Sequence, residues 1–560
     1  MKLTPFAKVF ITVILLAVVG YVLYAKRDTI GQWANQDKGA GGARTDKPAD
    51  KDRATAGGDT ADKGVSKDDF NGIGPSREAP RTGVTGISKA AVGAGKLGRK
   101  LVVGINTWAG HAPGIVANSG MTGGDKGSMY MSKYGLDVEF KLLEDPQAKL
   151  AAFIKGEIDI MWDTADSWAR EASALAEQGK GGKAILQQDW SRGGDGIVSL
   201  TSVKSVEDLR GKKIATTRYT PSHWLLLYLL SQSGLSSADK AEIEKNLVFT
   251  AEAPLAAAAF KSKNVDAAVT WEPDLSGAVK ARQEDAHILV STTAATNVIA
   301  DVLVAQNDLV QKAPETIVAF IHGWFDGIES IGRDPASAYA LVGKALKLSE
   351  DDVSGMLAGL KLTPFADNAL FFGLDGQRSQ FESLFNAAFI VWRKQGVISK
   401  AVDAKDCVDA RFVAALAEAY PGQKVVESFK FDPKKKVDPA KERAIINKQL
   451  TIYFTPGSDQ IMSGSNFILD SLGETMTAFG NTYLRIEGNT DNTGSRNANR
   501  TLSQKRADSV KDYLIQQFKI DEKRFQTVGH GSENPIADNK TEAGRQQNRR
   551  TDIKVVLNVQ

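Results

Sequence analysis

The stretch TDNTGSRNANRTLSQKRA, Thr490 to Ala507, decides the fold at the carboxyl end of this chain. It follows Tyr483–Asn489, where apolar residues alternate onto one face, as expected of a strand. It then enters a helix whose apolar positions fall at helical spacing: Leu502, Val510, Leu514 and Phe518. Asp491 is therefore predicted at the strand end and Arg506 in the first helical turns. A guanidinium binds a carboxylate and a carboxylate accepts from an ammonium, so this pair can hold a zwitterionic amino acid.

The same stretch resembles the signature of the OmpA-like peptidoglycan-binding domain, TD-x-x-G followed by N-x-x-LS-x-x-RA. The matching residues are Thr490, Asp491, Gly494, Asn499, Leu502, Ser503, Arg506 and Ala507. The resemblance implies a small α+β domain over residues 446–560. In it, Asp491 and Arg506, together with Asn499, would bind the diaminopimelate stem peptide of peptidoglycan. As an isolated pair, Asp491 could instead cap a turn while Arg506 pairs on a solvated face.

The amino end predicts a membrane anchor over residues 1–33, with a transmembrane helix at about residues 6–25. Val9–Ala25 is uncharged and apolar and is about long enough to span a bilayer. A cleaved signal peptide is the alternative, but the residues before Lys26 make a poor cleavage site. Since peptidoglycan lies outside the inner membrane, we expect a single-pass inner-membrane protein with its carboxyl-terminal domains in the periplasm.

Composition limits the other function classes. A chain of 560 residues is too long for one core, and a net charge of +3 gives no reason to expect nucleic-acid binding. Cys407 is the only cysteine, so neither an intrachain disulfide nor a multi-cysteine metal site is expected. No HExxH, G-x-S-x-G or P-loop pattern occurs. We therefore expect no enzyme activity, no metal and no cofactor.

Two segments have the composition of linkers. Residues 34–98 are rich in Gly, Ala, Lys, Asp and Thr and have few large apolar side chains, which predicts a disordered tether. Residues 421–445 contain the run FDPKKKVDPAK and are predicted to form a shorter basic linker.

Residues 99–420 predict an α/β domain with an internally repeated plan. Strands Lys100–Asn106 and Lys213–Thr216 each lead into a polar loop and then a helix that begins near a proline. Before the second helix, Thr220 has the chemistry of an N-cap. Such a helix start presents free amides that suit an anionic group.

A second matching pair of strands points to the same edge. Ile158–Trp162 and Val265–Thr270 each deliver a tryptophan followed by an acid to the carboxyl end of a strand. The residues concerned are Trp162, Asp163 and Thr164 in the first unit and Trp271 and Glu272 in the second. Because open parallel sheets bind ligands at that edge, two such lobes predict a clamshell that closes on a small molecule.

This plan resembles the type II periplasmic binding proteins, in the branch that serves taurine, aliphatic sulfonates, nitrate and thiamine precursors. The runs that show the resemblance are GINTWAGHAPGIVA (104–117), KGEIDIMWDTAD (155–166), SVEDLRGKKIATTRYTPSHWLL (205–226) and FKSKNVDAAVTWEPDL (260–275). The positions at which it implies ligand contact are Trp108, Asp163, Thr164, Thr220, Ser222, Trp271 and Glu272, with Arg218 as a further candidate. Asp189, Trp190 and Asp195, in the crossover between the lobes, either reach the cleft or cap a hinge.

The candidate residues also indicate the kind of solute. A site for a bare anion should avoid carboxylates, yet Asp163 and Glu272 both follow tryptophans. Tryptophan faces beside acids suit a cationic or planar group, whereas the helix start at Thr220 suits an acidic or polar end. We therefore expect an amphoteric or heteroaromatic molecule. Trp224, inside an apolar helix, is expected to pack in the core.

Together these features predict a membrane-tethered, cell-wall-anchored periplasmic solute receptor. It would deliver its solute to an ABC permease or report its presence to a membrane partner. The alternative is an envelope-organising protein whose clamshell is vestigial or binds a protein. Thiamine-pyrimidine synthases, enzymes that share the fold, depend on a cysteine cluster, and the lone Cys407 disfavours that class.

Overall fold

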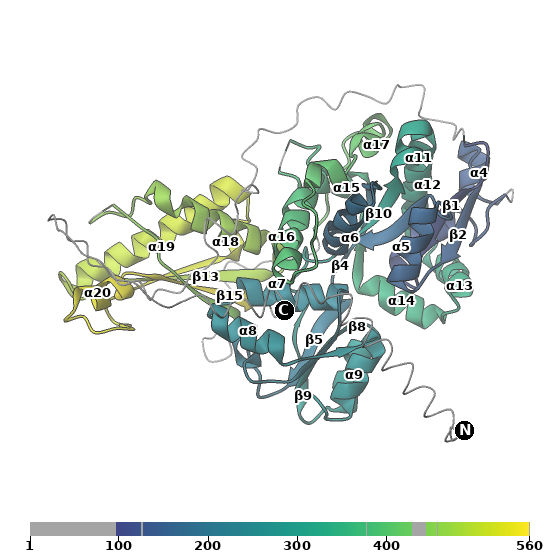
Figure 1. Cartoon of the computed structure of the whole chain (residues 1–560). Coiled ribbons are helices and arrows are strands. Elements are labelled where there is room, and N and C mark those ends of the chain that lie inside the picture. The colour runs from purple at the N-terminus through teal and green to yellow at the C-terminus, as the bar shows by residue number, and fades with distance from the viewer. Residues whose placement is uncertain (1–96, 125–126, 377, 428–443, 456, 559–560) are drawn as a thin grey trace, which may run out of the picture. The chain divides into compact units, whose positions relative to one another are not determined.

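The computed structural model describes residues 97–124, 127–376, 378–427, 444–455 and 457–558 (Figure 1). The predicted anchor, most of the predicted tether and most of the basic linker lie outside these residues. No helix within the described ranges is long and apolar enough to cross a membrane.

Two sheets organise residues 97–427. The first has the strand order β11-β4-β10-β3-β1-β2 and the second the order β7-β6-β8-β5-β9. Strands of the first sheet are β1 Leu101–Ile105, β2 Val138–Leu142, β3 Ile160–Thr164, β4 Gly182–Ser191, β10 Ala300–Gln306 and β11 Leu360–Leu362. Strands of the second are β5 Asp195–Leu200, β6 Ile214–Thr217, β7 Leu247–Thr250, β8 Ala267–Trp271 and β9 Ala286–Ser291.

The predicted repeat is present in the strand order. Each sheet has a parallel core of three strands, β2-β1-β3 in the first and β7-β6-β8 in the second. Each core continues into one antiparallel strand, β10 in the first sheet and β5 in the second. The chain enters the second sheet through β5 and returns to the first through β10, so two crossovers join the sheets.

Helices connect and cover these strands. They are α3 Ala112–Ala117, α4 Met129–Tyr134, α5 Pro146–Lys155, α6 Ala165–Glu177, α7 Pro221–Gln232, α8 Ser237–Lys245, α9 Ala253–Lys261, α10 Asp274–Ala281, α11 Asn307–Lys312, α12 Pro314–Arg333, α13 Pro335–Leu346, α14 Glu350–Ala358, α15 Phe365–Phe371, α16 Gln380–Lys394 and α17 Arg411–Ala414. Local sequence sets their ends. In α5, for example, Asp145 accepts a hydrogen bond from the amide of Ala148, Pro146 takes the first position, and Gly156 adopts the left-handed conformation that ends the helix.

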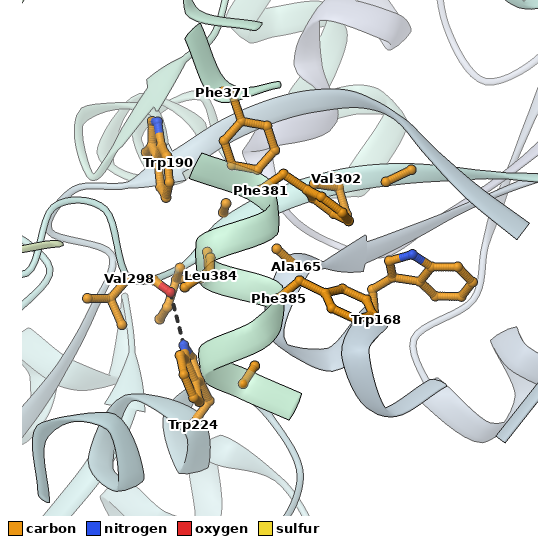
Figure 2. Packing of buried hydrophobic residues seen from close by; sticks show 14 of the residues in the cluster. Ala165, Trp168, Trp190, Trp224, Val298, Val302, Phe371, Phe381, Leu384 and Phe385 are labelled. Carbon is orange, nitrogen blue, oxygen red and sulfur yellow. Dashed lines mark hydrogen bonds between the residues drawn. The ribbon is translucent and has the colours of Figure 1, made fainter. Parts of the chain in front are cut away.

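Helix α16 anchors the core that the two sheets share. Figure 2 shows this helix between Trp168 of α6 and Trp224 of α7, with Phe381 beside Phe371. Trp224 is fully buried, and its indole NH donates to the carbonyl of Val298 at 2.9 Å. The prediction that Trp224 packs in the core is therefore confirmed.

Residues 444–455 and 457–558 form an α+β unit. Its sheet has the order β12-β15-β13-β14, and α18 and α19 pack together, with α19 against β13 and β14 (Figure 1). The elements are β12 Ala444–Leu450, α18 Asn466–Ala478, β13 Thr482–Asn489, α19 Arg496–Phe518, β14 Phe525–Gly531, α20 Glu542–Asn548 and β15 Thr551–Leu557. The predicted strand and helix around Asp491 are both present, as β13 and α19.

Candidate functional site

The first sheet brings three sequence-predicted residues to its edge in consecutive positions of β3. The sequence predicted a strand that ends at Trp162, but β3 runs to Thr164, so Asp163 and Thr164 lie inside the strand and not beyond its end. The reason is β10, which pairs antiparallel with β3 as far as Thr164 and extends it.

A buried ion network occupies the base of this edge. Asp163 and Lys149 are both buried, with 3.6 Å between Oδ1 and Nζ, and Lys149 also pairs with Glu171 at 3.0 Å. The same Nζ lies 4.4 Å from the ring centre of Trp162. Burial, followed by repulsion from Glu171, raises the pKa of Asp163. Asp163 and Trp162 therefore already share a cation supplied by the protein itself.

Trp108, which follows β1, lies beside a carboxyl group and is partly accessible to solvent. Its side chain is half-buried, and its indole NH donates to Asp189 Oδ2 at 3.4 Å. Gly110 and Gly194 make room for it, because a Cβ at either position would come within 2.9 Å of the indole. Asp189 thus belongs to the site, whereas its neighbour Trp190 is buried against Phe371.

The second sheet places its predicted residues around the start of α7. Thr220 is the N-cap residue, but its hydroxyl donates to the carbonyl of Thr217 at 2.7 Å and caps no helix amide. Ser222, in the first turn, is buried, and its hydroxyl has no hydrogen-bond partner in the described chain. Arg218 is exposed, with its guanidinium carbon 3.9 Å from the ring centre of Phe249. Neutral hydroxyl groups and a cationic guanidinium therefore lie near the start of α7.

The last predicted pair ends β8. Trp271 is half-buried and lies directly opposite Asp195 in the sheet. The carboxylate of Glu272 accepts from the amide of Ser276 at 3.1 Å, in the first turn of α10. Asp195 accepts from the hydroxyl of Ser191 at 2.7 Å and is buried. Glu272 raises the pKa of Asp195 as the lesser cause after burial, so the two carboxyls lie near one another.

Two further acids at this edge had not been singled out from the sequence. Asp166 is buried in the first turn of α6, and Asp301 is partly buried in β10. Asp301 stands opposite Thr164 on one side and Asp189 on the other. An aspartate within the apolar run ADVLVA was the only sequence signal for Asp301. Among the described residues, no group of His, Cys, Asp or Glu has metal-binding geometry.

The α+β unit has its own candidate site at the end of β13. Asp491 accepts from the amide of Thr493 at 2.8 Å and from Arg549 Nη1 at 2.6 Å. Asn499, on α19, donates to the carbonyls of Asp491 and Thr493 and so fixes this loop. The partner of Asp491 is Arg549, from the closing GRQQNRR run.

Arg506 completes this site from α19. Its Nε donates to the carbonyl of Ser458 at 3.1 Å, and its guanidinium carbon lies 4.9 Å from the ring centre of Phe454. Burial, followed by repulsion from Arg549, lowers the pKa of Arg506, whereas Asp491 raises it. Two guanidiniums and one carboxylate therefore lie together, which suits a ligand that carries a carboxylate.

Comparison with known proteins assigns the two parts of the chain. Residues 125–338 match the family described as NMT1/THI5 like, and residues 453–549 match the OmpA family. The sulfonate-binding protein SsuA from Escherichia coli has a similar structure: 18% identity and a TM-score of 0.43, covering 56% of this chain and 98% of that protein.

Curated relatives match the carboxyl-terminal part. Outer membrane protein Omp38 of Acinetobacter baumannii is 39% identical over 105 residues, which is 19% of this chain and 30% of that protein. Peptidoglycan-binding protein ArfA of Mycobacterium tuberculosis is 43% identical over 88 residues, which is 16% of this chain and 27% of that protein. The chain thus spans less than a third of the length of these relatives. Its residues 125–338 thus match the NMT1/THI5-like family, and its residues 453–549 match the OmpA family.

Proposed function

We propose that the protein is a periplasmic solute receptor that is attached to the cell wall. One observation supports this proposal. Two half-buried tryptophans and two buried aspartates lie where the chain crosses between the two sheets. Trp108 and Asp189 belong to the first sheet and the loop after β1, and Asp195 and Trp271 belong to the second sheet. A two-lobed binding fold commonly holds its ligand at such a position.

The OmpA family domain supplies the attachment in this proposal. Asp491, Arg506 and Arg549 together provide a carboxylate and two guanidiniums for a zwitterionic amino acid such as diaminopimelate. A receptor held near the wall and tethered to the inner membrane would capture solute and deliver it to an ABC permease, or report its presence to a membrane partner.

Two measurements test the two halves of this function. The full-length protein should sediment with purified sacculi, and Asp491→Ala or Arg506→Ala should reduce that binding by the roughly 2–5 kcal/mol typical of truncated charge pairs. Asp512→Ala, an exposed position on the same helix, is the matched control. In parallel, a panel of anions, zwitterions and cations should contain one class that raises the melting temperature.

The results separate the candidate functions. Sedimentation of the Asp491 and Arg506 variants at the level of the parent would contradict the wall attachment. A response to no class of solute would instead favour an envelope organiser whose clamshell binds no small molecule.

A further inference from the structure

The first residues of the predicted linker are bound to the clamshell. Residues 423–427, which we call the strap, lie after α17 and before the segment that leads to β12. The side chain of Gln423 accepts a hydrogen bond at 2.8 Å from a backbone amide in the first turn of α15. Glu427 pairs with Arg192 at 2.8 Å and with Lys361 at 3.5 Å. Polar contacts therefore hold the strap at both ends.

The partner of Glu427 belongs to a crossover between the two sheets. Arg192 lies between β4, which ends at Ser191, and β5, which begins at Asp195. Its Nη1 donates to Glu427 at 2.8 Å, and its Nη2 donates to the side chain of Asn297 at 3.1 Å. Asn297 lies in the other crossover, between β9 and β10. One guanidinium therefore connects the strap with both segments that join the lobes.

The two crossovers are also bonded to each other. The hydroxyl of Thr292 accepts from the amide of Gly193 at 2.8 Å and lies 2.9 Å from the hydroxyl of Ser191. Gly193 has a φ of +136°, which glycine adopts without strain. Two-lobed folds open and close through changes of backbone angle in such connecting segments. A rotation of the lobes therefore acts on the bonds that Arg192 makes with Asn297 and with the strap.

The attachment of the strap is weak enough to break reversibly. The side chain of Arg192 is 8% exposed, whereas that of Glu427 is 48% exposed. Burial alone would raise the pKa of Glu427, but the hydrogen bond and the charge of Arg192, followed by Lys361, lower it. Between the two ends of the strap, Val426 is 75% exposed and contributes little apolar burial. Retention of the strap thus depends on a half-exposed ion pair.

A purely structural tie is the alternative explanation. The pair of Arg282 and Asp285 is such a tie, because both residues lie in one lobe, between α10 and β9. Its exposure is similar, with Arg282 at 5% and Asp285 at 43%. The pair of Arg192 and Glu427 differs in that its guanidinium reaches both crossovers, which fixing the chain would not require.

We propose that the strap biases the angle between the lobes, so that movement of the chain that leads to the OmpA family domain alters how readily the receptor opens. This inference rests on the receptor function proposed above and adds a means of regulating it. When Glu427 leaves, Arg192 loses a charged partner at a mostly buried position, which is costly. The lobes then favour the angle at which the guanidinium gains water or other partners.

The test is pulsed electron paramagnetic resonance on the ligand-free, full-length protein, which measures the distance between one spin label on each lobe. The labels are attached at two exposed positions, Lys180→Cys before β4 and Lys280→Cys on α10, after Cys407→Ala removes the buried native thiol. Glu427→Gln and Arg192→Gln should each change the ratio of open to closed distances about two- to fivefold, as expected for a half-exposed ion pair.

The matched control is Asp285→Asn, which should keep the parental ratio. The double variant at Glu427 and Arg192 should change the ratio no more than either single variant, because both remove the same contact. Melting temperatures check the folding of every variant, and if Arg192→Gln does not fold, Glu427→Gln alone decides the outcome.

The outcomes separate the strap from the receptor. A parental ratio in Glu427→Gln, or an equal change in Asp285→Asn, would overturn the strap and leave the receptor function to the solute panel. Additive effects of the two Gln substitutions would overturn their shared contact as the cause. A null solute panel with the strap effect intact would count against the receptor function alone.

Discussion

At the scale of single residues, Asp491 of the OmpA family domain is already held by Arg549. The pKa of Asp491 is lowered: burial alone would raise it, but the hydrogen bond from Arg549 and those from Thr493 outweigh burial. Arg549 also pairs with Glu542 at 2.9 Å, so it is fixed from both sides. Arg549 therefore orients the carboxylate that a peptidoglycan ligand would meet.

Replacement of Arg549 by Ala should reduce sedimentation with sacculi by about tenfold, because Asp491 loses a charged hydrogen bond worth roughly 1.5–3 kcal/mol. Arg545→Ala is the control, since Arg545 lies on α20, just before Arg549, and pairs with Glu542 but not with Asp491. Equal binding by the Arg549 and Arg545 variants would contradict this positioning role.

The buried carboxyls of Asp166 and Asp195 predict how stability depends on pH. Burial raises the pKa of Asp166 to about 7 and that of Asp195 to about 6, from an ordinary value near 3.9 in an unfolded chain. In the folded protein these two carboxyls therefore retain protons that they release in the unfolded chain, and their contribution to the free energy of unfolding falls as pH rises from about 4 to 7. The charged groups that face this position are Asp166, Asp189, Asp195, Asp301 and Glu272.

Asp195→Asn should make that decline shallower, because the variant has no proton to lose. Urea unfolding of the ligand-free protein at pH 4.5, 6 and 7.5 measures the effect, with Asp308→Asn, at an exposed position, as the control. A decline as steep in the Asp195 variant as in the parent would show that this carboxyl does not titrate as described.

The sequence predicted side chains that follow their own strands better than those that meet through sheet pairing. The places of Trp108, Asp163 and Trp271 at the ends of strands could be predicted, because each lies at or near the end of an apolar run. Asp301 and Arg549 were missed as site residues, since their positions depend on antiparallel partners distant in sequence. The spacing of residues in the sequence does not show that β10 is inserted between β3 and β4.

At the scale of elements, α5 and α6 are held against β3 by the buried Lys149. This lysine is 1% exposed and neutralises Asp163 and Glu171, one on the strand and one on the neighbouring helix. The limits of α5 follow from local sequence, because its caps are Asp145 and Gly156. The predicted limits of β3, Ile158–Trp162, differ from those in the structure, because β10 determines where that strand stops.

Lys149→Met should destabilise the protein by about 3–5 kcal/mol, because it leaves two buried carboxylates without a counter-ion. Lys155→Met, at the exposed end of the same helix, should change stability by no more than about 0.5 kcal/mol. Chemical unfolding of the two variants gives the comparison, and a similar effect for both would contradict the role of the buried lysine.

At the scale of the whole molecule, the proposed attachment has two ends. The OmpA family domain is one, and the apolar segment Val9–Ala25, outside the described residues, is the other. We expect the mature protein to keep Met1 and to fractionate with the inner membrane, and protease added to spheroplasts should digest the carboxyl-terminal domains. Recovery of a soluble form that begins near Lys26 would identify the segment as a signal peptide.

The exchange of strands between the sheets also sets an order of assembly. All strands of the second sheet come from one continuous stretch, Asp195–Ser291, whereas β10 must enter the first sheet between β3 and β4. A chain that emerges amino end first therefore holds β3 and β4 with facing unpaired edges until the entire second lobe has been made. Such edges are prone to aggregation, so the nascent chain should depend on chaperones during this interval.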